Sequence, residues 1–300
     1  MGGPCRWCAP SRGRHRAAAR SPKRRTVTDE PAGDGRGPDP DAGPGRFLRD
    51  PRTECTGVPE HLRGFGGLHG GLALALVAGA MGEHAERREL VSATGRFGRA
   101  IDAPFRVETV PGHTGRSSAT VSGRIESGRG PLLDSRAVFA GKSGGVSWPV
   151  VELPAPEVPG PGECETFAVP KEFVPISTST EIGPVGSARP CAGGAEAELV
   201  AWVRLTEDDL PPDALRFVFL VDALAPSYSA VLSTLAPVPT AEITVRPAAG
   251  LAAASSPWLL LRATTRQADP SGWSSEWVDA WGRDGTHLGS AQQLRVVRGG

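Results

Sequence analysis

A histidine and five glycines stand within eight residues at the start of the apolar segment GFGGLHGGLALALVAGAM, residues 64–81. Glycine has no Cβ, so another group can approach its backbone more closely than that of any other residue. The segment is apolar enough to form a core helix, and a helix seldom begins among so many glycines. The residues around His69 are therefore the first candidates for chemistry.

Other reactive residue types give no complete site. Cys5 and Cys8 form one C-x-x-C pair, but no second pair or nearby histidine supplies the four ligands of a structural zinc site. The cysteines number five and are scattered, which favours reduced thiols over a disulfide framework. The G-x-S-x-G turn that presents a catalytic serine is absent as well. We expect neither a metal nor another cofactor.

The charge balance and the hydropathy pattern exclude several classes of protein. The 300 residues include 33 Lys and Arg and 33 Asp and Glu, so no net charge attracts nucleic acid. The longest apolar run, residues 72–81, is too short to cross a bilayer, and the N-terminus lacks the apolar core of a signal peptide. We expect a cytoplasmic protein with no nucleic-acid partner and no membrane span. Assembly into a homo-oligomer is left open.

The first part of the chain differs in composition from the rest. Residues 1–58 are rich in Gly, Pro, Arg and Asp and have almost no apolar periodicity. Such a segment buries too little apolar surface to offset the entropy of ordering it. It is predicted to be a disordered N-terminal tail.

Two similar series of elements follow the tail. Residues 59–141 contain an apolar, small-sided helix at 68–81, which should be enclosed on most faces, and then four strand-like runs separated by Gly and Pro turns. The runs cover residues 89–100, 105–117, 118–127 and 131–141. Residues 142–165 have no periodicity and are interpreted as a linker.

The second series occupies residues 166–298. Strands are expected at 167–177 and 198–207, followed by a helix at 211–225 that starts with proline. Four more strand-like runs complete the series at 238–247, 257–268, 272–285 and 286–297. The chain thus has an α+β pattern in which one helix followed by four antiparallel strands occurs twice.

Several ordered motifs carry a resemblance to a known family. They lie between Phe65 and Arg298 and read GGLHGG, GRSSATVSGRI, AWVRL, VDALAPS, PVPT, PWLLLR and DGTHLGSAQQLRVV. In this order and spacing they resemble the acyl-CoA thioesterase II family and the wider thioesterase-like superfamily. The resemblance implies a double hotdog, in which two repeats of an antiparallel sheet each wrap around a central helix.

The resemblance also implies a hydrolytic site. In the family, an Asp late in the second helix, a Thr at the start of the next strand and a Gln in the last strand hold the attacking water. These map onto Asp222, Thr240 and Gln293, the last because it completes the family's Ser-x-x-Gln pattern from Ser290. Asp222 would take the proton from water, and the two neutral groups would orient that water. Taken singly, the three also fit a helix-terminal Asp, an ordinary strand Thr and a surface amide.

The glycine-rich segment acquires a role by the same resemblance. The start of the first helix points at the acyl thioester in the family, so the backbone at Gly70 and Gly71 would bind the substrate carbonyl as negative charge develops on it. His69 would donate to the same oxygen or orient a neighbour, and a capping or packed histidine is an equal alternative. The last strand departs from the Gln-Glu-Gly of well-known members, because Leu294 and Arg295 follow Gln293.

Two functions are open at this point. The first is an acyl-CoA thioesterase that hydrolyses the thioester of an acyl-CoA to free acid and CoA, with an Asp as general base. The second is a non-catalytic hotdog protein that binds acyl-CoA or a lipid. Convergence of Asp222, Thr240 and Gln293 beside the first helix's N-terminus would favour hydrolysis.

Overall fold

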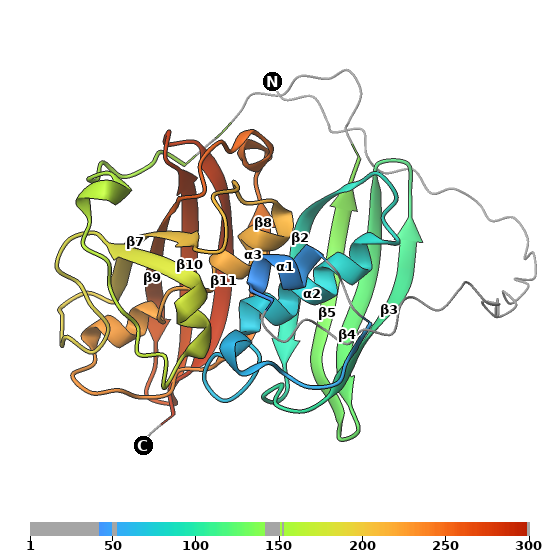
Figure 1. Ribbon diagram of the computed structural model, residues 1–300, viewed down its shortest axis with the longest axis horizontal. Coiled ribbons are helices and arrows are strands. Elements are labelled where there is room, and N and C mark those ends of the chain that lie inside the picture. The colour runs from blue at the N-terminus through green and yellow to red at the C-terminus, as the bar shows by residue number, and fades with distance from the viewer. Residues whose placement is uncertain (1–41, 50–52, 142–150, 152, 299–300) are drawn as a thin grey trace, which may run out of the picture. The chain divides into compact units, whose positions relative to one another are not determined.

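The structure is a computed structural model that describes residues 42–49, 53–141, 151 and 153–298. One antiparallel sheet of 11 strands runs through it, and the helices lie on one face of this sheet (Figure 1). The chain forms two hotdogs, one after the other, as the sequence predicts. The predicted α+β double hotdog is confirmed.

The first hotdog is built on helix α2 (Gly70–Gly82). Four strands wrap around this helix: β2 (Glu89–Phe97), β3 (Phe105–Thr114), β4 (Ser118–Ser127) and β5 (Gly130–Ala140). A short strand β1 (Glu54–Cys55) pairs with β3 at the edge of the sheet. These bounds lie close to the predicted ones because Gly and Pro turns separate the strands in the sequence.

Helix α2 is buried on all sides, in agreement with its small, apolar residues. Leu72, Leu74 and Leu76 are at most 1% exposed, and burial of each side chain contributes roughly 1.5–3 kcal/mol to folding. The strands pass close to the helix where they carry glycine. A Cβ at Gly123 of β4 would lie 2.6 Å from the Val77 side chain. Glycine there lets the sheet wrap tightly around α2.

The second hotdog repeats this plan around helix α3 (Ala214–Leu220). Its strands are β6 (Thr180–Pro184), β7 (Glu198–Leu205), β8 (Thr240–Pro247), β9 (Leu259–Ala268), β10 (Trp273–Gly282) and β11 (His287–Val296). Helix α3 is shorter than predicted and starts at its N-cap Asp213, whose carboxylate accepts from the N–H groups of Leu215 and Arg216. Short 3-10 turns lie at 60–62, 161–163, 175–179, 227–231 and 249–253.

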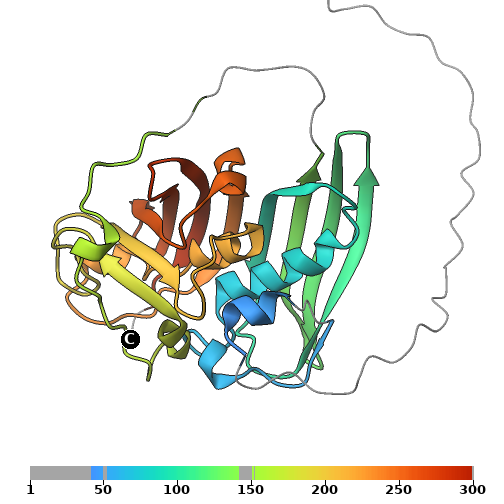
Figure 2. The same ribbon diagram turned by 45° about the horizontal axis from the view of Figure 1, so that its top comes forward.

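The two hotdogs join through one pair of strands. The strand order is β1-β3-β4-β5-β2-β8-β11-β10-β9-β7-β6, so β2 of the first hotdog pairs with β8 of the second. The two strands are antiparallel, and the hydroxyls of Thr94 and Thr244 lie opposite each other at 2.9 Å. The order outward from this junction is the same in both directions: β2-β5-β4-β3 and β8-β11-β10-β9. Helices α2 and α3 meet on the inner face (Figure 2).

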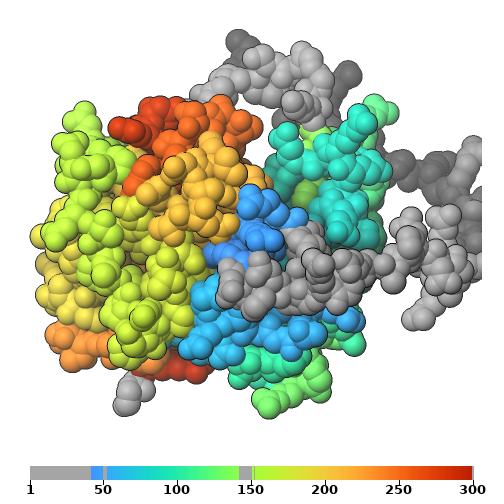
Figure 3. All heavy atoms as spheres, in the orientation of Figure 1, coloured from blue at the N-terminus to red at the C-terminus, as the bar shows by residue number. Residues whose placement is uncertain are grey.

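The prediction of a disordered tail is wrong for residues 42–49 and 53–58; residues 1–41 and 50–52 lie outside the described part. Helix α1 (Pro44–Arg49) packs against α2 and α3, with Phe47 and Leu48 buried. The segment lies between the two hotdogs on the face shown in Figure 3. Apolar content alone did not indicate this helix, because its anchor is a distant carboxylate, Glu207.

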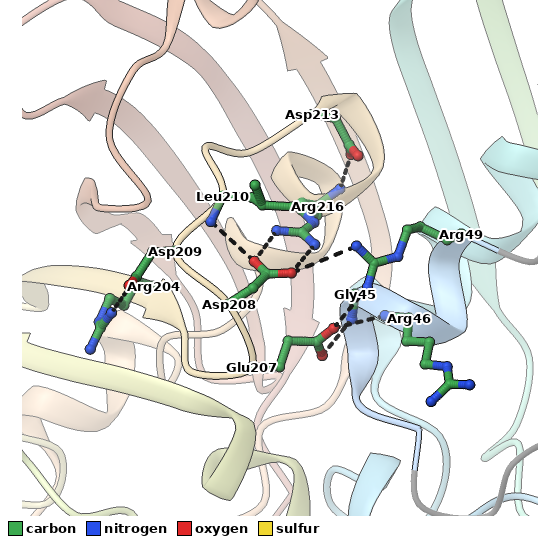
Figure 4. Close-up of polar contacts among 10 residues, drawn as sticks. All are labelled: Gly45, Arg46, Arg49, Arg204, Glu207, Asp208, Asp209, Leu210, Asp213 and Arg216. Atoms are coloured by element: carbon green, nitrogen blue, oxygen red, sulfur yellow. Dashed lines mark hydrogen bonds and ion pairs between the residues drawn. The ribbon is translucent and has the colours of Figure 1, made fainter.

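Figure 4 shows how acidic side chains fix α1 and α3 to each other. Glu207 accepts from the N–H groups of Gly45 and Arg46 at 2.9 and 2.8 Å, which caps the start of α1. The next residue, Asp208, accepts two hydrogen bonds of 2.7 Å from the buried guanidinium of Arg216. This pairing lowers the pKa of Asp208 and raises that of Arg216. One loop therefore anchors the first turns of both helices.

Two further expectations need correction. The predicted strand at 167–177 is a turn followed by a 3-10 helix at Pro175–Ser179, because prolines interrupt the pattern of strand hydrogen bonds. Part of the predicted linker packs on the sheet: the indole N–H groups of Trp202 and Trp281 donate to the carbonyls of Pro159 and Leu153 at 2.8 and 2.9 Å. Residues 142–150 and 152 of that linker lie outside the described part.

Candidate active site

Asp222 lies at the meeting point of the two hotdogs. It follows the last residue of α3 by two positions and is 9% exposed. Its Oδ2 accepts a hydrogen bond of 2.8 Å from the N–H of Gly71, in the first turn of α2. The positive end of the α2 dipole favours a carboxylate at this place. A side chain of the second hotdog is thus fixed by the helix of the first.

The glycines at the start of α2 make this contact possible. A Cβ at Gly71 would lie 2.7 Å from the Cβ of Asp222 and 2.8 Å from the carbonyl oxygen of Phe219. A Cβ at Gly70 would lie 3.2 Å from Asp222 Oδ2. The N–H of Gly71, which we expect from the resemblance to bind the substrate carbonyl, donates to Asp222 in this structure. Gly70 is the first helical residue, so its N–H has no acceptor within the helix.

His69 is the N-cap residue of α2 and borders the same carboxylate. Its side chain makes no capping hydrogen bond; its ring packs edge-on against Phe219, with centroids 5.3 Å apart. Nδ1 is buried without a hydrogen-bond partner, 3.9 Å from Asp222 Oδ2. Burial lowers the pKa of His69, an effect that Asp222 opposes and Arg295 adds to. The ring is therefore neutral at neutral pH.

Thr240 and Gln293 meet on the inner face of the second hotdog. The hydroxyl of Thr240, the first residue of β8, donates to Oε1 of Gln293 on β11 at 3.0 Å. Gln293 is 3% exposed, whereas the neighbouring Gln292 faces outward and is exposed. The choice of Gln293 over Gln292 agrees with this alternation. The amide nitrogen of Gln293 is buried and has no hydrogen-bond partner.

Arg295 connects these groups, and the sequence reasoning gave it no role. Its Nη1 donates to Thr240 Oγ1 at 2.8 Å, and its Nη2 lies 3.4 Å from Asp222 Oδ1. Its Nε donates to Glu276 Oε2 at 2.6 Å. The side chains of Arg295 and Glu276 are buried. Glu276 also accepts a hydrogen bond of 2.6 Å from the N–H of Ser227.

A signal for this pair was present in the sequence. Residues two apart on a strand face the same side, so Arg295 must share the inner face with Gln293. In the sheet, Glu276 of β10 lies directly opposite Gln293, and Arg295 lies opposite Thr240. Glutamate and arginine are seldom fully buried unless they are paired. One of each on the inner face of neighbouring strands therefore predicts an ion pair.

The matching face of the first hotdog has no buried charge, and Ser135 is the buried polar residue among its described strands. Its inward-facing strand residues include Val121, Ile125, Ala137 and Phe139, each at most 3% exposed. Within the described ranges, the cluster of Asp222, Glu276, Arg295, Thr240 and Gln293 thus has no counterpart on the first hotdog's strands. The geometry provides one site for the two hotdogs.

Comparison with known families decides the identity of the chain. The model of the acyl-CoA thioesterase N-terminal domain matches residues 58–140, and the model of the acyl-CoA thioesterase C-terminal domain matches residues 155–297. The chain belongs to the acyl-CoA thioesterase family. It is therefore placed among thioester hydrolases, and the resemblance stated from its motifs is confirmed.

Solved structures share the fold of this thioesterase at low sequence identity. A hot dog-fold protein of unknown function from Alicyclobacillus acidocaldarius is 23% identical, with a TM-score of 0.74 over 82% of this chain and 92% of its own. An acyl-CoA thioesterase II from Mycobacterium marinum is 18% identical, with a TM-score of 0.57 over 76% of this chain and 88% of its own. No curated protein matches the sequence.

Two further observations concern membrane spans and metal sites. No helix in the described ranges is long and apolar enough to cross a membrane. Among the same residues, no group of three or more His, Cys, Asp or Glu is placed to hold a metal ion. Cys5 and Cys8 lie outside the described part, the buried Cys55 thiol donates to the carbonyl of Gly57 at 3.0 Å, and Cys164 and Cys191 are free thiols.

Proposed function

We propose that this chain hydrolyses an acyl-CoA to free acid and CoA, with Asp222 as the general base. Water attacks the thioester carbonyl carbon, and its proton passes to Asp222. The C–S bond then breaks, and the leaving CoA sulfur takes the proton from Asp222, which restores the carboxylate. The observation that carries the proposal is that Arg295 links Asp222, which is fixed at the N-terminus of α2, to the hydrogen-bonded pair of Thr240 and Gln293.

The hydrogen bonds support a division of roles. Asp222 Oδ2 is fixed by Gly71, whereas Oδ1 has only the long 3.4 Å contact with Arg295, so Oδ1 is the oxygen that receives the proton. Thr240 and Gln293 orient the water without competing for its proton. The unpartnered amide nitrogen of Gln293 offers the donor that water or substrate needs.

The substrate carbonyl fits at the start of α2. As the tetrahedral intermediate forms, its oxygen becomes negative, and a helix N-terminus stabilises that charge. The N–H of Gly70 and the unpartnered Nδ1 of His69 are the donors for this oxygen. A neutral imidazole suits this role, because it donates a hydrogen bond without forming an ion pair with Asp222.

An acyl-CoA chain-length panel tests the function. Free thiol would be measured after purified protein is mixed with each acyl-CoA, and binding would be measured separately by calorimetry. We expect thiol release that saturates with at least one acyl-CoA and falls by about 10²- to 10⁴-fold in Asp222→Asn. A protein that binds acyl-CoA but releases no thiol would instead be the non-catalytic binding protein.

A further inference from the structure

The ion pair of Arg295 and Glu276 lies inside the site, yet the reaction described above does not use it. Two charged side chains, 6% and 1% exposed, lie against the proposed catalytic groups. Burying charges costs free energy that the pair only partly recovers, so such pairs are weak contributors to stability. A role in the reaction accounts for their position.

We propose that Arg295, held by Glu276, is the positioning residue that sets the hydrogen-bond direction in the water-binding group; this inference rests on the proposed hydrolysis. A guanidinium only donates hydrogen bonds, so Thr240 Oγ1 must accept from Arg295. The single hydroxyl hydrogen of Thr240 is then directed to Oε1 of Gln293. This orientation of the amide leaves the Gln293 nitrogen, which has no hydrogen-bond partner, as a donor for water.

Glu276 keeps the guanidinium from binding the general base too strongly. The contact of Arg295 with Glu276 measures 2.6 Å, and its contact with Asp222 measures 3.4 Å. Glu276 is itself fixed by the N–H of Ser227. Among the described residues, the other charged or titratable group that lies near Asp222 is His69, from the start of α2. Arg295 is thus directed at Thr240 while Asp222 Oδ1 stays open to water.

A variant cycle tests this positioning role. The pair is replaced by Arg295→Met with Glu276→Gln, which removes both charges and keeps an acceptor for Ser227. Thr240→Val is then added both to the wild type and to the pair variant, which gives four proteins in all. We expect the replacement to lower kcat by about 10- to 100-fold in the wild type, with KM changed less than about threefold. In the Thr240→Val background it should cost less than about threefold, because Arg295 acts through Thr240.

An ion pair between a buried arginine and a half-buried aspartate serves as the control. Arg216 and Asp208 form a similar ion pair at the start of α3, away from Asp222. Arg216→Met with Asp208→Asn should lower the melting temperature and leave kcat per folded molecule unchanged. Should the variant of the Arg295–Glu276 pair fail to fold, Arg295→Lys replaces it. One ammonium cannot reach all three acceptors of the guanidinium, so kcat should still fall about 3- to 30-fold.

Two results would overturn the inference and leave the proposed function intact. One is a folded pair variant with wild-type or higher kcat, which would make Arg295 a bystander or an inhibitor. The other is a loss that multiplies with that of Thr240→Val, which would make the two residues independent. Failure of the wild type to hydrolyse any acyl-CoA would instead remove the proposed function, and this inference with it.

Discussion

Replacement of Gly71 by alanine examines the contact between the two hotdogs directly. The added Cβ would lie 2.7 Å from the Cβ of Asp222 and 2.8 Å from the carbonyl oxygen of Phe219, so α2 and the end of α3 must move apart. The hydrogen bond from Gly71 N–H to Asp222 Oδ2 would lengthen or break. The substitution therefore affects both stability and the position of the proposed base.

The magnitude follows from three effects. Overpacking costs about 1–3 kcal/mol, and loss of a hydrogen bond to a charged group costs about 1.5–3 kcal/mol. Alanine recovers nearly 1 kcal/mol through its helix propensity. We expect Gly71→Ala to lower the free energy of unfolding by about 1.5–5 kcal/mol, and kcat to fall on the order of 10²-fold because the base is displaced.

Urea unfolding and acyl-CoA kinetics would measure both effects. Gly82→Ala is the matched control, because Gly82 ends the same helix and its added Cβ would make only an ordinary contact of 3.8 Å with the Phe139 ring. The control should be neutral or slightly stabilising, with wild-type kcat. A Gly71→Ala protein that unfolds and turns over like the wild type would show that the close approach of α2 and Asp222 is not needed.

Three more predictions concern the base, the N-terminal segment and acid stability. Asp222→Asn should lower kcat more than Thr240→Val does, since an amide cannot accept the proton while loss of the hydroxyl only loosens the water; equal losses would argue against a general base. Deletion through Val58 should lower the melting temperature by several degrees, because α1 and its buried side chains are lost; an unchanged melting temperature would refute the packing role. Arg216 lowers the pKa of Asp208, so their pairing contributes stability above the ordinary Asp pKa of about 4 that is lost as pH falls through the folded-state pKa. Urea titrations from pH 7 to pH 3 should show a smaller acid loss in Asp208→Asn than in wild type, and equal slopes would contradict this.

Most of the fold was predictable because its signals are local. Turns rich in Gly and Pro bound nearly every strand, and α2 is recognisable from a run of small apolar residues. The failures have non-local causes. Helix α1 is capped by Glu207, more than 160 residues away, as the sequence separations of 161 and 162 in its two hydrogen bonds show. The false strand at 167–177 has apolar residues in a strand-like pattern, but Pro170 and Pro175 cannot donate to a sheet.

The site was predictable only in part. The resemblance indicated Asp222, Thr240 and Gln293, and the structure brings them together; their catalytic roles stay predictions. Arg295 and Glu276 were missed because they are not part of the family's motif. The burial of Gln293 depends on strand alternation, and the same alternation would have placed Arg295 beside it. The ion-pair partners of Arg295 and Glu276 depend on the register of β8, β10 and β11. That register is known only from the folded sheet.

Because β2 pairs with β8, the two hotdogs cannot be separated without exposing a strand edge on each. Cutting the polypeptide between the hotdogs would leave each half with a bare strand edge, and such edges associate with other chains. Each half would also lack part of the site, because α2 belongs to one and Asp222 to the other. A half expressed alone would therefore have an unpaired strand at the junction and only part of the proposed site. Separately expressed halves would form the complete proposed site only by associating through β2 and β8.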